Sequence, residues 1–180
     1  MADAVKKYRV FTDGSFNKAN PNETHGGIVY WDLENDKPDT MFHITCTDAR
    51  LCSGWNVGGE VIAGYLAVWG LVQQLLNGGR TADDYPVEIE LVYDYEGVGN
   101  WMNGTWKNAK SPSAKWYKEK MTALINSCPN LWIKWVWVRA HTGMCAGNTL
   151  ADKVASCDGA YWKNGANGVI HIPIDNVDMI

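Results

Sequence analysis

The chain has 180 residues, of which 46% are hydrophobic and ten are Trp, and its formal net charge is −4. This length predicts one domain with a sizeable core, and no Pro-rich, Ser-rich or charge-blocked stretch divides it. Five cysteines, an odd number without a Cys-x-x-Cys pair, argue against both a disulfide framework and a zinc site.

Hydrophobic periodicity predicts three consecutive strands and then an alternation of helices and strands. The expected strands are 8–14, 25–33, 39–46, 87–94 and 131–139. The expected helices are 59–77, 113–126 and 147–159, with a shorter helical stretch at 96–103. This order predicts an α/β fold in which a five-stranded mixed sheet is flanked by helices.

One carboxylate stands out in the helix predicted at 59–77. Glu60 is the only charged residue between Gly59 and Gly79, a composition typical of a helix that is buried on most faces. A single Glu in the first turn of a helix often does no more than complement the helix dipole. For Glu60 taken alone, that explanation and a functional one are equally open.

Three aspartates stand at comparable junctions. Asp13 ends the first predicted strand before a Gly-Ser turn, Asp94 closes the fourth, and Asp152 lies in the first turn of the last predicted helix. A single Asp in such a place is most often a turn former or a dipole partner. Four carboxylates of this kind are what a divalent-metal site requires, because Mg²⁺ prefers oxygen ligands.

The residues around these carboxylates resemble the motifs of type 1 ribonuclease H, in its bacterial form with a single catalytic domain. Asp13-Gly14-Ser15 resembles the first-strand motif of that family. Asn56-Val-Gly-Gly-Glu60 is similar to its helix-entry segment, with an Asn four residues before the Glu.

Two further motifs follow in the order of the family. Tyr93-Asp94-Tyr-Glu-Gly97, with Trp101 and Trp106-Lys107 after it, is similar to the third motif of a bacterial subgroup. Ala140-His141-Thr-Gly143 and then Asn148-Thr-Leu-Ala-Asp152 resemble the histidine loop and the last metal-ligand helix. The resemblance covers residues 8–160.

The resemblance implies a ribonuclease H-like fold in which the first and fourth strands are neighbours, which sets Asp13 beside Asp94. It implies an endonuclease that hydrolyses the RNA strand of RNA/DNA hybrids by a two-metal-ion mechanism and leaves 5′-phosphate and 3′-hydroxyl ends. Asp13, Glu60 and Asp94 would hold two Mg²⁺ ions most directly, with Asp152 completing one site. Mn²⁺ is the expected substitute for Mg²⁺.

His141 follows the last predicted strand, in a loop that contains Gly143 and Gly147. A lone His is more often structural than functional. The family motif implies instead that His141 assists proton transfer or product departure, for which the near-neutral pKa of imidazole is suited. The loop from His141 to Asp152 is one residue longer than the commonest family spacing.

Candidate ribose contacts are the backbone groups at Gly14 and Ser15 and the side chain of Asn56, because the 2′-hydroxyl distinguishes RNA from DNA. Asn148 is a further candidate for substrate binding. Structural alternatives stay open: Ser15 as a turn residue and Asn56 as a helix cap.

A net charge of −4 contrasts with the basic face that proteins usually present to phosphates. The candidate positive surface interleaves lysines with tryptophans: Lys107, Lys110, Lys115, Lys118, Lys120, Trp101, Trp106 and Trp116. Here Lys107 is the candidate for substrate binding and Trp106 for stacking against a DNA sugar. The long basic protrusion of many relatives is shortened in this chain, and a solvated helix face with inward tryptophans is the open alternative.

Residues 161–180 lie past the resemblance and form an added strand, a dimer contact or a loose tail. We expect a cytoplasmic protein without membrane contact, since residues 1–7 lack the apolar stretch of a signal peptide. We also expect a monomer without an obligate protein partner, and the sequence does not contain the separate N-terminal hybrid-binding module of some relatives. Two other functions stay open. The Asp-Gly-Ser and histidine-loop motifs argue against a DNA nuclease of the same broad fold, and the retention of all four carboxylates argues against a non-catalytic nucleic-acid-binding domain.

Overall fold

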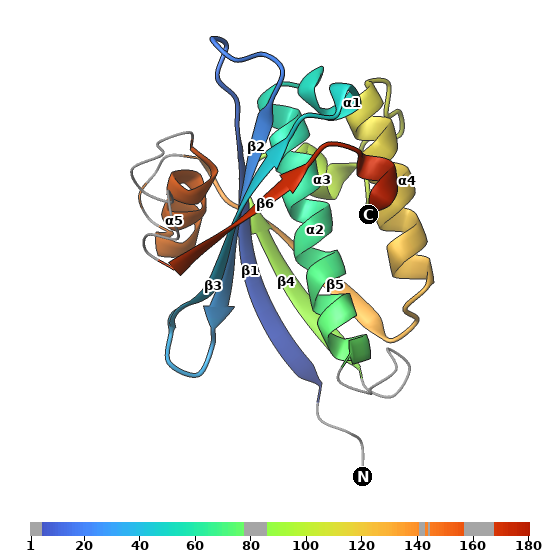
Figure 1. Ribbon diagram of the computed structural model, residues 1–180. Helices are drawn as coiled ribbons and strands as arrows, with labels where there is room; N and C mark the ends of the chain where they lie inside the picture. The colour runs from blue at the N-terminus through green and yellow to red at the C-terminus, as the bar shows by residue number, and fades with distance from the viewer. Residues whose placement is uncertain (1–4, 78–85, 141–142, 144, 157–167) are drawn as a thin grey trace.

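The computed structural model describes residues 5–77, 86–140, 143, 145–156 and 168–180. The described residues form one six-stranded sheet with helices on both faces (Figure 1). The strands are β1 (Lys6–Ser15), β2 (Thr24–Asp32), β3 (Lys37–Cys46), β4 (Val87–Tyr93), β5 (Leu131–Trp137) and β6 (Val169–Ile174). The helices are α1 (Ala49–Cys52), α2 (Asn56–Asn77), α3 (Gly97–Asn100), α4 (Pro112–Asn126) and α5 (Ala146–Ala155), followed by the 3-10 turn η2 (Val177–Met179).

The strand order is β5-β4-β1-β2-β3-β6. β1, β2 and β3 pair antiparallel, whereas β4 is parallel to β1, β5 to β4 and β6 to β3. The predicted α/β fold with a mixed sheet is therefore confirmed, but the predicted count of five strands is wrong. The sixth strand contains Pro173, which cannot donate a ladder hydrogen bond and is tolerated because β6 lies at the edge of the sheet.

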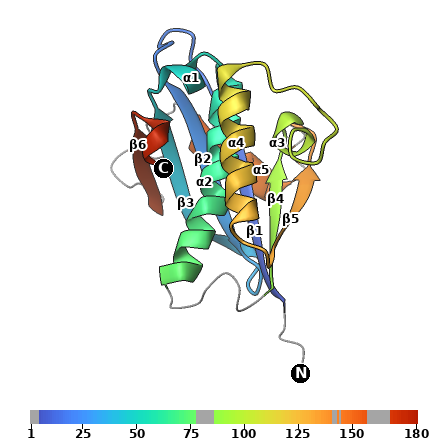
Figure 2. The same cartoon turned by 90° about the vertical axis from the view of Figure 1, so that its right-hand side faces the viewer.

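The helices form two unequal layers. α2 and α4 cover one face of the sheet and α5 covers the other (Figures 1 and 2). The larger hydrophobic core lies under α2 and α4, and a smaller one under α5 joins Phe11 and Val29 to Ala151 and Val154. α2 is long and apolar enough to cross a membrane by length and composition, but 67% of that stretch is buried in the protein, as expected of a core helix.

Element boundaries correct three predicted positions. α2 begins at Asn56 and not at residue 59, so Glu60 lies in its second turn. α5 begins at Ala146, which puts Asp152 in the second turn as well. β1 continues to Ser15, so Asp13 lies inside the strand, whereas β4 ends one residue earlier than predicted, so Asp94 directly follows it.

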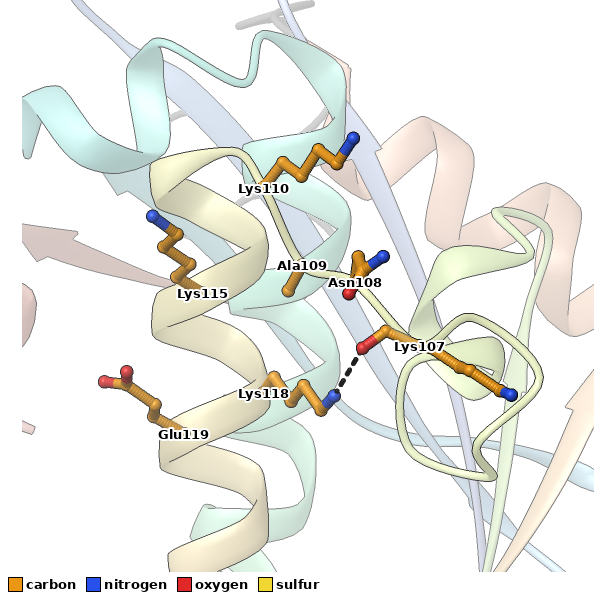
Figure 3. Close-up of a pocket in the computed structure, with 7 residues that line it drawn as sticks. All are labelled: Lys107, Asn108, Ala109, Lys110, Lys115, Lys118 and Glu119. Carbon is orange, nitrogen blue, oxygen red and sulfur yellow. Dashed lines mark hydrogen bonds between the residues drawn. The ribbon is translucent and has the colours of Figure 1, made fainter.

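A short segment joins α3 to α4 in the place of the long protrusion. Ser111 caps α4 by accepting a hydrogen bond from Ala114 N at 3.2 Å. The ammonium group of Lys118 donates to the carbonyl oxygen of Lys107 at 3.1 Å and so ties the segment to the helix. Figure 3 shows the side chain of Lys107 extending away from α4, on the side opposite to Lys115.

Candidate metal centre

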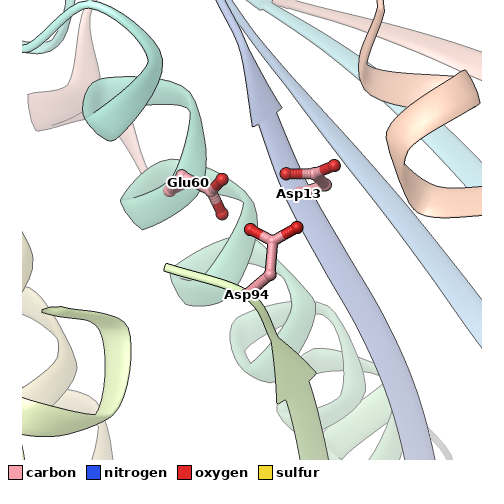
Figure 4. Close-up of side chains that lie close together, drawn as sticks. All are labelled: Asp13, Glu60 and Asp94. Atoms are coloured by element: carbon pink, nitrogen blue, oxygen red, sulfur yellow. The ribbon is translucent and has the colours of Figure 1, made fainter. Parts of the chain in front are cut away.

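Three carboxylates lie close together at the C-terminal end of β4. Asp13, Glu60 and Asp94 each offer one oxygen, and these oxygens all lie within 4.8 Å of one another (Figure 4). The parallel register of β1 and β4 runs as far as Phe11 opposite Val92. The residues that follow on the two strands therefore stay side by side, which brings Asp13 next to Asp94 as the resemblance implies.

Glu60 reaches the same place from α2 because Gly14 lets the helix approach the strand. A Cβ on Gly14 would lie 2.3 Å from the backbone nitrogen of Glu60 and 2.5 Å from the carbonyl oxygen of Asn56. Such distances are too short for any side chain, so only glycine allows β1 to run against the first turns of α2. This close approach joins the second carboxylate to the first.

The fourth carboxylate comes from α5, on the other face of the sheet. A Cβ on Gly27 would lie 2.4 Å from the carbonyl oxygen of Ala151, so glycine also permits this helix to lie directly on the sheet. Asp152 is half-buried and lies outside the group of three, but its charge adds to the repulsion on Asp13. The structure thus places Asp152 beside the cluster rather than within it.

Burial dominates the electrostatics of the cluster. Asp13 is 4% and Glu60 3% exposed. Burial, and then repulsion from Asp94, raises the pKa of Asp13 to about 7, although a hydrogen bond with Glu60 and a 2.8 Å hydrogen bond from the backbone N–H of Gly14 act to lower it. Burial and the neighbouring charge of Asp13 raise the pKa of Glu60 well above its usual value. A proton shared by Asp13 and Glu60 therefore compensates for the crowding when no cation is bound.

The donor set fits a divalent cation. Glu60 Oε2 is buried and has no hydrogen-bond partner within the described part of the chain, and an unpaired buried carboxylate oxygen is costly unless something else binds it. All three side chains offer oxygen, the ligand that Mg²⁺ prefers, and they leave coordination positions for water and substrate. The residues present therefore match a magnesium-type centre.

The candidate ribose contacts border the cluster. Ser15 is half-buried at the end of β1, and Asn56 is exposed at the start of α2, where its carbonyl oxygen faces Gly14. Asn148 lies one helical turn before Asp152 on α5. It is 6% exposed, and its Oδ1 finds no partner among the described residues.

Of the three tryptophans between β4 and β5, two are core residues. Trp101 and Trp116 are 8% and 6% exposed, so neither can stack on a ligand without unfolding the core. Trp106 is half-buried, and its ring packs edge-on against Trp101 and Tyr95 at 5.3 and 6.2 Å between centroids. Lys107 beside it is exposed.

His141 lies outside the described residues. The chain just before it is fixed to the cluster by two hydrogen bonds, one of them from the backbone N–H of Val138 to the carbonyl oxygen of Tyr93 at 2.8 Å. The other runs from the indole N–H of Trp137 to the backbone oxygen of Asp94 at 3.0 Å. Sequence reasoning missed Trp137, because an aromatic residue at a strand end carries no sign of the backbone that it will hold.

A sequence model of the RNase H family matches residues 89–161, which include Asp94 and Asp152 but not Asp13 and Glu60. No curated protein matches the chain.

Several solved structures share the fold. RNase H1 from the halophilic archaeon Halobacterium salinarum NRC-1 has a TM-score of 0.58 at 19% identity, over 82% of this chain and 93% of that chain. The N-terminal RNase H domain of rv2228c from Mycobacterium tuberculosis has a TM-score of 0.59 at 21% identity, over 83% and 91%. LC11-RNase H1, solved in complex with an RNA/DNA hybrid, has a TM-score of 0.59 at 20% identity, over 82% and 92%.

At these identities the structures establish the fold, and the match to the RNase H family model covers residues 89–161, less than half of the chain. The geometry then brings Asp13 and Glu60, from the first half, to Asp94 in the second. The motifs, the family match over residues 89–161 and the fold thus agree in their similarity to ribonuclease H.

Proposed function

We propose that the protein is an endonuclease that hydrolyses the RNA strand of RNA/DNA hybrids and leaves 5′-phosphate and 3′-hydroxyl ends. The observation that carries this proposal is the convergence of three carboxylate oxygens within 4.8 Å, from three separate elements of a ribonuclease H fold. The complex of the structurally similar LC11-RNase H1 with an RNA/DNA hybrid supports the choice of substrate.

Asp13, Glu60 and Asp94 would bind the catalytic cations, which we propose to be two Mg²⁺ ions replaceable by Mn²⁺, with Asp152 completing one of the two sites. When bound, such ions supply the positive charge that activates a water molecule and stabilises the leaving 3′ oxygen. The carboxylates fix where that charge lies with respect to the scissile phosphate. An amide replacement removes the negative charge that attracts the cations, so we expect Asp94→Asn to lose both metal binding and cleavage.

Proton release accompanies metal binding at this site. Because the pKa of Asp13 is raised to about 7, the metal-free cluster holds a proton at neutral pH that a cation must displace. The apparent affinity for Mg²⁺ should therefore increase as the pH rises through about 7. This dependence provides a readout that does not rely on cleavage.

We propose further that His141 moves a proton or assists product departure, and that Gly14, Ser15 and Asn56 contact the ribose of the cleaved strand. Gly14 and Asn56 lie against each other at the cluster, which supports this assignment. Trp106 and Lys107 lie on the segment between α3 and α4 and would contact the DNA strand. We propose Asn148 as a substrate contact as well, because its Oδ1 has no partner among the described residues.

Cleavage of an end-labelled RNA strand in an RNA/DNA hybrid tests the function. Single-stranded RNA, duplex RNA and duplex DNA are assayed alongside, each with Mg²⁺ and with chelator. Asp94→Asn is compared with Asp39→Asn, which changes an exposed Asp of β3 in the same way.

We expect the wild type and Asp39→Asn to cut only the hybrid, and only with Mg²⁺. Binding of the hybrid without cleavage would replace the proposal with a non-catalytic nucleic-acid-binding domain. Cleavage of duplex DNA would replace it with a DNA nuclease.

A further inference from the structure

Two aromatic side chains from separate loops stack at the surface. Phe16 follows the last residue of β1, and Trp55 precedes the first residue of α2. Their rings lie 6.2 Å apart between centroids at an angle of 20°. Trp55 is 60% exposed and Phe16 is half-buried, and neither belongs to the two hydrophobic cores. The pair therefore presents a flat aromatic face to solvent.

The backbone of Trp55 is held in an unfavourable conformation. Its φ of 56° lies in the left-handed region, where a bulky side chain is a genuine outlier. Asp36 has the other positive φ among the described non-glycine residues, and Asp tolerates this region far better. Strain of this kind persists only where the surroundings enforce it, and it gathers at ligand-binding sites.

One buried hydroxyl connects the two loops. The side chain of Thr24, which is fully buried, donates to the carbonyl oxygen of Trp55 at 2.7 Å. The same hydroxyl lies 3.5 Å from the carbonyl oxygen of Ser15, the residue before Phe16. The backbone N–H of Trp55 donates to the carbonyl oxygen of Cys52 at 3.0 Å. These contacts fix the backbone and leave the indole ring in solvent.

The aromatic face borders the acidic cluster. The residue after Trp55 is Asn56, whose carbonyl oxygen would lie 2.5 Å from a Cβ on Gly14. Gly14 directly follows Asp13 and precedes Phe16 by two residues. Both rings thus belong to residues that are one or two positions from the Gly14–Asn56 contact, which adjoins Asp13 and Glu60.

We propose that the Phe16–Trp55 face binds the nucleic-acid substrate by stacking against a sugar ring beside the scissile phosphate, an inference that rests on the proposed function. In a duplex the base faces are covered by their neighbours, whereas the sugars line the groove and offer an apolar C–H face. Stacking of this kind does not depend on base sequence. Because the backbone already holds Trp55 in place before the substrate arrives, binding loses little conformational entropy at this residue.

Steady-state cleavage of the hybrid by Trp55→Ala tests the proposal, with Trp55→Phe as the conservative variant. Trp132→Ala is the matched control, since Trp132 is 58% exposed near the start of β5, at the opposite end of β4 and β5 from Asp94. We expect Trp55→Ala to raise KM by about fivefold to a hundredfold, taking the range found for base–aromatic stacking as a guide, with kcat within twofold. Trp55→Phe should retain most of the affinity, and Trp132→Ala should match the wild type.

A purely structural role for Trp55 makes a different prediction. Trp55→Gly relieves the unfavourable φ, so its Tm should not fall, whereas its KM should rise as in Trp55→Ala. If Trp55→Ala and Trp132→Ala have the same KM as a wild type that cuts the hybrid, the stacking proposal is wrong and the proposed function stands.

If the wild type does not cut the hybrid, the proposed function fails, and equilibrium binding of the labelled hybrid in chelator decides the stacking proposal separately. Binding that is weaker for Trp55→Ala than for the wild type and Trp132→Ala would support it. Equal binding by all three proteins would overturn it.

Discussion

Replacing Asp13 with Asn should stabilise the metal-free protein above neutral pH. The substitution keeps the shape of the side chain and an oxygen that can accept the hydrogen bond from the backbone N–H of Gly14. It removes one charge from a cluster whose three oxygens lie within 4.8 Å of one another. A stabilising mutation at the centre of a candidate active site is unexpected unless burial, and then repulsion from neighbouring carboxylates, makes the ionised Asp13 unfavourable.

The size of the effect follows from the raised pKa of Asp13. A pKa that rises from 3.8 in the unfolded chain to about 7 in the folded protein corresponds to about 4 kcal/mol, at 1.36 kcal/mol for each pH unit. The folded state holds the proton more tightly, so the stability of the wild type falls as the pH rises from about 4 to about 7. Since Glu60 shares this proton, about 4 kcal/mol is the upper bound for Asp13→Asn at pH 8.

Thermal unfolding in chelator between about pH 4 and pH 8 measures the difference. In a domain of this size about 1 kcal/mol changes the Tm by about 2–4 °C, so Asp13→Asn should melt several degrees above the wild type at pH 8 and lose this advantage near pH 4. Mg²⁺ should raise the Tm of the wild type and not that of Asp13→Asn. Asp39→Asn, at an exposed position, is the control. A lower Tm for Asp13→Asn than for the wild type at pH 8 in chelator would refute the reasoning.

Three further predictions concern the surroundings of the cluster. Gly14→Ala places a Cβ 2.3 Å from Glu60 N, so it should destabilise the fold by about 1–3 kcal/mol and weaken Mg²⁺ binding in a calorimetric titration; unchanged binding would contradict the role of Gly14. Burial, and then the nearby His25 and His171, lowers the pKa of His43 to about 4. As the pH falls from 6.5 to about 4, the unfolded chain therefore takes up a proton that the folded protein does not, and the free energy of unfolding falls by up to about 3 kcal/mol. Urea unfolding across this range should show a shallower loss for His43→Gln, and an identical slope would count against the assignment. Val177→Ala, at a fully buried site of η2, should destabilise by about 2 kcal/mol in urea and leave cleavage intact, unless the C-terminal segment takes part in the reaction.

The parts of the site that follow from local pattern were predictable. Asp94 stands where an alternating strand ends, and parallel pairing then sets it beside Asp13. Both positions depend on the two-residue period of strands and on the family order of the motifs. Glu60 was noticed for its isolation in an apolar helix and assigned through the motif around it, although the helix begins earlier than predicted.

The parts that depend on contacts between distant segments were not predictable. An added strand was one of three alternatives for residues 161–180, but its pairing with β3 depends on the return of the chain to that edge after α5, and Pro173 weakens the strand signal. Trp137 acts through a hydrogen bond to the backbone of Asp94, which no periodicity reveals. The strain at Trp55 is a property of its φ and of the distant Thr24 hydroxyl. Each of these features arises from tertiary structure, where local propensity has no influence.

Sulfur substitution at one RNA phosphate tests most directly whether cations held by Asp13, Glu60 and Asp94 contact the scissile bond. Both phosphorothioate diastereomers at a single linkage of an RNA/DNA hybrid are cut with Mg²⁺ and with Mn²⁺, because Mg²⁺ binds sulfur poorly and the softer Mn²⁺ accepts it. We predict that at least one diastereomer is cut much more slowly than the oxygen hybrid with Mg²⁺ and regains its rate with Mn²⁺. If both diastereomers are cut with Mg²⁺ as fast as the oxygen hybrid, the result would contradict a metal centre at the scissile phosphate.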